Sequence, residues 1–199
     1  RESMNENIAT VPIAVNISAK QLQAKNFCAN IEKIMRDHGI SPSLIVFELT
    51  ESTVMSDDNE LTDILQQLQQ LGIRIAIDDF GTGYSSFSRL HKCPVDILKI
   101  DQSFTRRIDD DVNNSTSIIK AMINMAKALK IRVVAEGVET DQQHAFLRDN
   151  ECDAVQGYWV SRSLSTQEFG NQLQKQVVQG QGVHAPKPST QPVSILNGN

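Results

Sequence analysis

The chain alternates between short apolar runs and longer stretches with helical periodicity. Six runs of four to six residues are rich in Ile, Val and Leu, which is typical of buried β-strands. They cover residues 11–16, 44–48, 73–78, 95–100, 131–136 and 153–156. The runs begin about 20 to 36 residues apart, which leaves room for a helix between neighbouring strands. This alternation predicts βα units around a parallel sheet.

Between the runs, apolar side chains recur at helical spacing and small polar residues mark helix starts. Three pairs have the spacing of a capping box: Ser18 and Gln21, Thr140 and Gln143, and Ser165 and Glu168. Ser56 is predicted to cap a helix whose apolar stripe ends at Gly72. A later helix is predicted to face the core with Ile118, Ile119, Met122, Ile123, Ala126 and Leu129.

Each predicted strand carries a polar residue at or near its carboxyl end. These residues are Asn16, Glu48, Asp78, Lys99, Glu136 and Gln156. An aspartate after a strand often only opens a turn, but turn chemistry does not explain groups able to bind metal, phosphate or water at six strand ends. Barrel active sites draw on several strand ends at once. We therefore expect a TIM-like (β/α)8 barrel rather than an open doubly wound sheet.

The length of the chain bounds how much of such a barrel it can form. A complete barrel takes about 250 residues, so this chain of 199 residues represents about six of the eight βα units. We expect the missing strands to precede the first residue. Residues 1–178 are predicted to form this partial barrel domain. Residues 179–199 turn to Gly, Gln, Pro and Ser and are predicted to be a disordered C-terminal tail.

The strand at residues 73–78 ends on two adjacent acids, Asp78 and Asp79, in the sequence IRIAIDDFGTGYSS. Side chains alternate between the faces of a strand, so both acids can share one site only if the chain leaves the sheet between them. Gly81 and Gly83 permit such a turn. Two acids held together repel each other unless cations lie between them, which points to a metal site.

The composition and net charge of the chain limit the kinds of molecule that it is expected to bind. With 40% hydrophobic and 22% charged residues the chain is an ordinary soluble globular protein. Its net charge of -5 argues against binding to nucleic-acid polymers or anionic membranes, which needs a basic surface. No apolar run approaches the roughly 20 residues that span a bilayer, and the first residues do not resemble a signal peptide. A phosphate-bearing substrate would therefore have to be bound by a local device, and we expect metal ions in that role.

The cysteines and histidines indicate no further metal site. The three cysteines are far apart and lack CxxC spacing, so they indicate neither a disulfide framework nor a zinc site, and they fit a cytoplasmic location. The four histidines show no ligand spacing either. Tethering of a longer parent protein to a membrane through preceding sequence stays open.

Six motifs in unbroken order give the chain a specific resemblance. VNIS at 15–18, ELTES at 48–52, DDFGTGYSS at 78–86, LKID at 98–101, AEGVET at 135–140 and QGY at 156–158 resemble the EAL domains. That family comprises bacterial phosphodiesterases for cyclic di-GMP, built on a modified TIM barrel. The resemblance covers about residues 11–169. It implies hydrolysis of cyclic di-GMP to linear pGpG.

The resemblance also implies roles for individual residues. Five would bind two divalent ions, Mg²⁺ or Mn²⁺, with Asp78 bridging the pair: Asn16, Glu48, Asp78, Asp79 and Glu136. Lys99 would hold the attacking water, and Gln156 would contact substrate or the water network. Glu51 would anchor the loop at residues 80–85 in its active shape. Two metals a few ångströms apart activate a water and stabilise both oxygens of an in-line displacement.

The chain also departs from the family. The Glu-Ala-Leu signature strand is absent, so one family metal ligand has no counterpart here. An alternative is therefore a catalytically incompetent EAL-like module that binds cyclic di-GMP or a protein partner. Retention of Asp78, Asp79 and Lys99 favours the enzyme. A Schiff-base role for Lys99 is disfavoured, because acids such as Asp96 and Asp101 would keep the amine charged. We further expect an upstream sensor or cyclase domain, and a homodimer formed through the barrel.

Overall fold

A computed structural model of the chain describes residues 10–56, 58–83, 87–110 and 114–178. It confirms the predicted parallel sheet, in which the strands follow one another in chain order and every neighbouring pair is parallel. The strands are β1 Ile13–Asn16, β2 Ile45–Thr50, β3 Arg74–Phe80, β4 Ile97–Ile100, β5 Arg132–Ala135 and β6 Ala154–Val155. They form the curled, partial barrel that was predicted.

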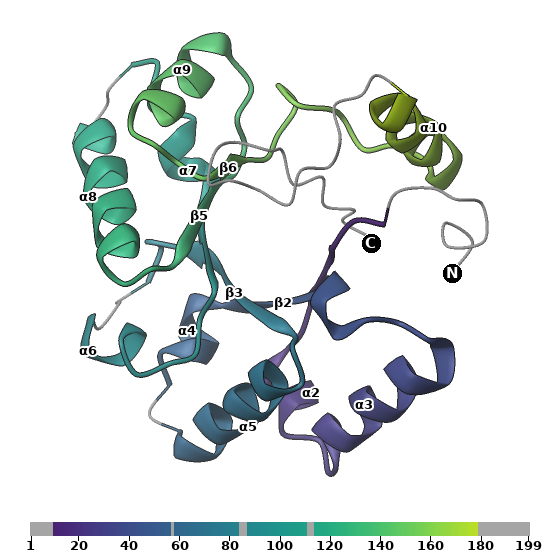
Figure 1. The fold of residues 1–199 in the computed structure, drawn as a ribbon. Helices are drawn as coiled ribbons and strands as arrows, with labels where there is room; N and C mark the ends of the chain where they lie inside the picture. The colour runs from purple at the N-terminus through teal and green to yellow at the C-terminus, as the bar shows by residue number, and fades with distance from the viewer. Residues whose placement is uncertain (1–9, 57, 84–86, 111–113, 179–199) are drawn as a thin grey trace.

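Helices follow the strands and lie outside the curled sheet (Figure 1). The longer ones are α3 Phe27–His38, α5 Asn59–Gln70, α8 Ser115–Ala128, α9 Asp141–Asp149 and α10 Thr166–Val178. The short ones are α2 Ala19–Leu22, the 3₁₀ helix η1 Pro42–Leu44, α4 Glu51–Val54, α6 Phe87–Leu90 and α7 Gln102–Thr105. In the described residues no helix is long and apolar enough to span a membrane. The predicted tail at 179–199 lies outside the described residues.

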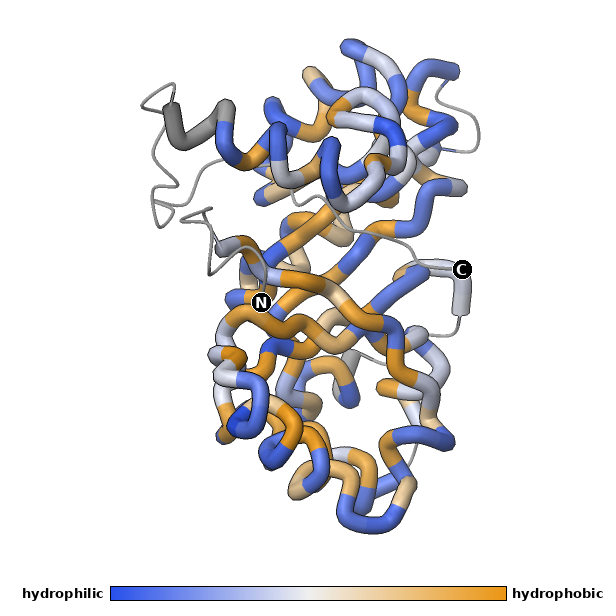
Figure 2. Tube along the Cα trace, turned by 90° about the vertical axis from the view of Figure 1, so that its right-hand side faces the viewer, coloured by the Kyte–Doolittle hydropathy of each residue, from blue (hydrophilic) through white to orange (hydrophobic). Residues whose placement is uncertain are grey.

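The inner face of the sheet is built in two layers. Six apolar residues form a small cluster of their own, and each lies two positions before one of the polar strand ends: Ala14, Val46, Ala76, Ile97, Val134 and Ala154. Residues two apart in a strand face the same side, so this cluster forms an apolar floor under the polar residues. The other face of the strands packs against the helices in the larger core, and Figure 2 shows the hydrophobic strands running through the middle of the molecule.

Helix starts follow the predicted caps with one exception. Ser18 and Thr140 both form complete capping boxes, and Ser165 exchanges hydrogen bonds with Glu168. The predicted cap at Ser56 is wrong. Its hydroxyl donates to the carbonyl of Thr53 at 2.9 Å, which closes α4. Asp58 caps α5 instead, because its carboxylate accepts from two backbone N–H groups of the first turn.

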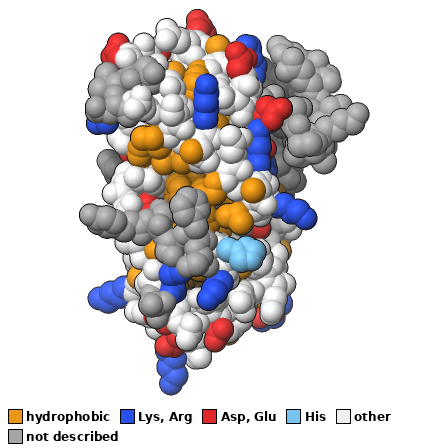
Figure 3. All heavy atoms as spheres, turned by 90° about the vertical axis from the view of Figure 1, so that its left-hand side faces the viewer, with side chains coloured by type: hydrophobic (Ala, Val, Ile, Leu, Met, Phe, Trp, Pro, Cys, Tyr) orange, Lys and Arg blue, Asp and Glu red, His pale blue; other side chains and the backbone are white. Residues whose placement is uncertain are grey.

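One predicted core position of α8 is wrong as well. Ile119, Ile123 and Ala126 are fully buried, but Ile118 is 39% exposed. Ile118 lies one residue before the buried line of the helix, so its side chain points about 100° away from that line. On the face formed by α6 and α8, hydrophobic side chains gather at the surface (Figure 3).

Two aspartates at the amino-terminal edge of the sheet accept hydrogen bonds from backbone N–H groups of neighbouring strands. Asp96, just before β4, accepts a hydrogen bond from the backbone N–H of Ile75 in β3 at 2.8 Å. Asp153, just before β6, accepts one from the N–H of Val133 in β5, also at 2.8 Å. Each carboxylate thus satisfies a strand N–H that would otherwise be buried without an acceptor.

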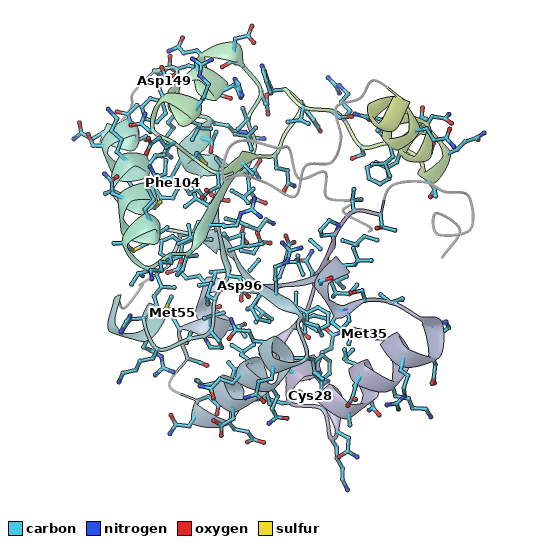
Figure 4. The ribbon with its side chains drawn as sticks, in the orientation of Figure 1. Cys28, Met35, Met55, Asp96, Phe104 and Asp149 are labelled. Atoms are coloured by element: carbon cyan, nitrogen blue, oxygen red, sulfur yellow. The ribbon has the colours of Figure 1, made fainter. Side chains whose placement is uncertain are left out.

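We expect Asp96→Ala to destabilise the fold by about 1–3 kcal/mol, because the N–H of the fully buried Ile75 would lose its acceptor. Asp149→Ala is the matched control, since Asp149 is exposed on α9 whereas Asp96 lies beside the sheet, just before β4 (Figure 4). Urea unfolding followed by circular dichroism measures both variants. If the urea midpoint of Asp96→Ala equals that of Asp149→Ala, the hydrogen bond between Asp96 and Ile75 does not contribute to stability.

Candidate metal centre

Lys99 lies at the centre of the polar layer. Its side chain is almost completely buried, and its Nζ contacts three carboxylates from three different strands or strand ends. The distances are 2.8 Å to Glu48 Oε1, 2.7 Å to Asp78 Oδ1 and 2.7 Å to Glu136 Oε1. An ammonium group has three N–H donors, so this arrangement uses all of them.

The charges around Lys99 alter the ionisation of the cluster. Burial favours a neutral amine, but Glu136, Glu48 and Asp78 outweigh it and raise the pKa of Lys99 above its ordinary value. Burial also raises the pKa values of Glu48 and Glu136, although Lys99 partly offsets this. Lys99 therefore remains an ammonium at neutral pH. That state is incompatible with a nucleophilic, Schiff-base lysine.

The two adjacent acids reach the same site by a different route from the one expected. The chain does not leave the sheet between Asp78 and Asp79, because β3 continues to Phe80. Its pairing with β4 instead shifts register between Ile77 and Phe80, and Asp79 adopts a left-handed backbone with φ of 53°. A bulge of this kind re-aims a side chain within a strand. Carboxylate oxygens of Asp78, Asp79 and Glu136 consequently lie within 4.8 Å of one another.

This donor set fits a hard divalent cation. Among the described residues, the ammonium of Lys99 only partly balances four carboxylates, those of Glu48, Asp78, Asp79 and Glu136. Burial raises the pKa of Asp79, and the neighbouring carboxylates of Asp78 and Asp101 raise it further. Oxygen-only ligands suit Mg²⁺ or Mn²⁺ and give little preference for zinc.

Asn16 and Gln156 flank the cluster on the two outer strands. Asn16 closes β1, is exposed, and pairs in register with Glu48. Gln156 follows β6, and its N–H donates to the carbonyl of Ala135 at 2.8 Å. The Gln156 Oε1 atom is buried and has no hydrogen-bond partner within the described part of the chain. A buried acceptor without a donor is costly, so this oxygen is a candidate ligand or substrate contact.

Glu51, at the start of α4, ties down the loop that follows the two aspartates. Its Oε2 accepts from the N–H groups of Gly81 at 2.9 Å and Gly83 at 3.2 Å. Gly81 has a φ of +100°, and a Cβ there would collide with Phe104 at 2.8 Å. Glycine is therefore required at Gly81 both by conformation and by space. The buried carboxylate of Glu51 fixes the backbone immediately after Asp79.

The comparison with protein families decides which family this is. The EAL domain family matches residues 2–163, which is most of the chain. The chain belongs to the EAL domain family. Its six motifs and their order are thus explained by common descent, and the curled parallel sheet belongs to an EAL-type barrel fold.

Curated and solved EAL proteins are similar over most of the chain. The cyclic di-GMP phosphodiesterase NbdA of Pseudomonas aeruginosa is 41% identical over 76% of this chain and 19% of its own length. The MucR phosphodiesterase of the same organism, solved as a c-di-GMP complex, is 37% identical with a TM-score of 0.75, over 79% of this chain and 64% of that one. The EAL domain of Mycobacterium smegmatis DcpA is 33% identical with a TM-score of 0.81, over 87% of this chain and 78% of that one.

The chain spans only about a fifth of the length of the first curated relatives that it matches. Several of these relatives are named as signalling proteins, and MucR is named as bifunctional. The EAL-type segment described here is thus a part that recurs within longer proteins.

One residue of this EAL site was missed by sequence reasoning. Asp101 lies two residues after Lys99, directly after β4, is buried, and raises the pKa of Asp79. Its carboxylate also accepts from the N–H of Ser103 at 2.9 Å and so caps α7. The two-residue spacing from Lys99 was the available signal, because alternate residues of a strand share a face.

Proposed function

We propose that this EAL domain hydrolyses cyclic di-GMP to linear pGpG with the help of two divalent metal ions. The observation that supports it best is the convergence of Glu48, Asp78 and Glu136 on Lys99, with Asp79 bulged to the same side. The similar proteins named as cyclic di-GMP phosphodiesterases supply the substrate class. We further propose that a full-length protein supplies the two preceding strands and the family's Glu-Ala-Leu glutamate.

The residues that would hold the ions come from four strands. They are Asn16 from β1, Glu48 from β2, Asp78 and Asp79 from β3, and Glu136 after β5. When bound, Mg²⁺ or Mn²⁺ would activate the attacking water and neutralise the phosphodiester. The apolar floor under these side chains keeps bulk water from reaching them from below, which strengthens every charge interaction in the site.

The other site residues position the reacting groups. Lys99 stays protonated and does not act as a base. Its three N–H groups are directed at Glu48, Asp78 and Glu136. Once metal ions bind these carboxylates, the ammonium would be free to donate a hydrogen bond to the attacking water and to stabilise developing negative charge. Glu51 holds the backbone of Gly81 and Gly83 and thereby fixes Asp79. The Oε1 of Gln156, which lacks a hydrogen-bond partner among the described residues, would accept a hydrogen bond from substrate or from the water network.

A second candidate function is a non-catalytic module that binds cyclic di-GMP or a protein partner. The retained acids argue against it, because a module that only binds nucleotide does not need several repelling carboxylates around one lysine. We also propose a homodimer and an upstream sensor or cyclase domain. The exposed Ile118 of α8 supports the homodimer, and the greater length of the relatives supports the upstream domain.

Replacing Mg²⁺ with Ca²⁺ is expected to preserve binding of cyclic di-GMP and to lower turnover at least about tenfold. Both ions prefer oxygen ligands, but Ca²⁺ is larger, takes about 6–8 ligands and imposes a less strict geometry. The full-length protein is measured by calorimetry for binding and by chromatography for hydrolysis, with each ion in turn. Equal hydrolysis rates with Mg²⁺ and Ca²⁺ would contradict a nucleophile set by metal geometry.

A further inference from the structure

Two neighbouring loops at the carboxyl-terminal edge of the sheet are joined through their backbones. Residues 136–140 follow β5, and residues 156–161 follow β6. The N–H of Val138 donates to the carbonyl of Gln156 at 3.0 Å, and the N–H of Trp159 donates to the carbonyl of Val138 at 2.9 Å. Gly157 lies so close to the backbone of Val138 that a Cβ would not fit. The strand pairing therefore continues irregularly beyond both strands.

The side chain of Trp159, the one tryptophan of the chain, fastens the second loop to α9. Its Nε1–H donates to Asp141 Oδ1 at 2.8 Å. Its ring stacks on His144, with centroids 3.7 Å apart and planes 10° from parallel. Asp141 and His144 are three residues apart on α9, so the indole lies along the first turn of that helix. Polar and stacking contacts together fix the orientation of the ring.

The first turn of α9 is itself a rigid support. Gln143 is buried and completes the capping box with Thr140. Asp109, from the segment after α7, accepts from Thr140 Oγ1 at 3.1 Å and from Gln143 Nε2 at 2.9 Å. The Oε1 of Gln143 also accepts from the N–H of Glu139 at 2.7 Å, which reaches into the first loop. Trp159 therefore binds to a helix end that is already held in place.

Both loops begin at residues of the candidate metal centre. Glu136 contacts Lys99, whereas the carboxamide oxygen of Gln156 has no partner in the described residues, so its position depends on the backbone. We propose that Trp159 is a positioning residue that clamps these two loops together and so sets where Gln156 stands relative to Glu136. The indole is 39% exposed and lies outside the core, which separates this role from general stability.

Hydrogen exchange in the full-length protein tests the clamp directly. Trp159→Leu removes both the stacking and the indole donor, and Trp159→Phe keeps a ring that can stack but cannot donate. We expect exchange of the Val138 amide to speed up about tenfold in the first and about threefold in the second, because local opening becomes easier. Tyr158→Leu is the matched control, since it removes an adjacent, more exposed aromatic ring. Tyr158→Leu is expected to leave the exchange rate of the Val138 amide unchanged.

The outcome is compared with exchange at β4, which reports the core. Faster exchange confined to residues 136–140 and 156–161 supports the clamp. Unchanged exchange at Val138 in Trp159→Leu overturns it. Equal acceleration at Val138 and at β4 also overturns it, because Trp159 would then act only on global stability.

A phosphodiesterase assay tests whether the clamp affects the reaction, and this test rests on the proposed hydrolysis of cyclic di-GMP. With Mn²⁺ present, Trp159→Leu is expected to lower kcat about tenfold with little change in KM, and Trp159→Phe to recover part of the loss. Faster loop exchange with unchanged kcat would overturn the link between the clamp and the reaction. If the wild-type protein hydrolyses no cyclic di-GMP, the proposed function fails, but the exchange result still decides whether Trp159 clamps the loops.

Discussion

Asp78→Asn in the full-length protein is expected to abolish metal-dependent hydrolysis of cyclic di-GMP, with a loss of at least about 100-fold. The Asp78 carboxylate contacts Lys99 at 2.7 Å and lies within 4.8 Å of carboxylate oxygens of Asp79 and Glu136. An amide offers one neutral oxygen where the carboxylate offers two charged ones. Affinity for Mn²⁺ should therefore fall together with turnover, which calorimetry and a phosphodiesterase assay measure separately.

The same substitution should leave the fold intact. Lys99 keeps Glu48 and Glu136 as partners, and removing one charge relieves the repulsion that raises the pKa of Asp79. We expect the melting temperature without added metal to stay within about 5 °C of the wild type. Asp149→Asn, an exposed change on α9, is the control for losing a single acid. Wild-type turnover in Asp78→Asn would rule out its place in the metal centre.

Residues 1–199 expressed alone are expected to show no measurable phosphodiesterase activity. The first reason is chemical. The chain contains no Glu-Ala-Leu sequence, so the glutamate that this signature supplies in the family is missing from the metal ligands. With fewer protein charges, at least one metal ion would be bound more weakly.

The second reason is structural. Within the described residues β1 and β6 each pair with a single strand, which leaves two unpaired parallel edges. Ile13 and Val15 of β1 are 51% and 40% exposed. Exposed edges and apolar strand faces favour association between chains. We therefore expect residues 1–199 expressed alone to be unstable and prone to association.

Hydrolysis with Mn²⁺, thermal unfolding and sedimentation are measured for residues 1–199 and for the full-length protein. Full activity in a monomeric, cooperatively unfolding 199-residue chain would show that the missing glutamate is dispensable. The assignment of the metal ligands would then be wrong.

The sequence predicted those features that depend on strand periodicity. The apolar runs and their polar ends located Glu48, Asp78, Lys99 and Glu136, and the two-residue repeat of a strand places them on one face above the apolar floor. Strand bounds were less accurate. The run at 153–156 forms a strand only at Ala154–Val155, because its first residue bonds to β5 through its side chain.

Features that depend on tertiary contacts could not be predicted. The bulge at Asp79 arises from the register between β3 and β4, which a single strand does not encode. The triple contact of Lys99 requires the curl of the sheet to bring distant strands together. Ser56 and Asp58 are both good caps by residue type, and only the path of the chain after α4 decides between them. The contacts of Trp159 with α9 likewise join separate βα units.

The most direct test of the proposed phosphodiesterase activity is product analysis of cyclic di-GMP incubated with the full-length protein. Chromatography and mass spectrometry follow the reaction with Mn²⁺, with Mg²⁺, and with a chelator. We predict conversion to linear pGpG with either ion and none with the chelator, since the acids around Lys99 require cations to act on a phosphodiester. Tight binding of cyclic di-GMP without any hydrolysis in the presence of Mn²⁺ and Mg²⁺ would contradict the account and identify a binding module instead.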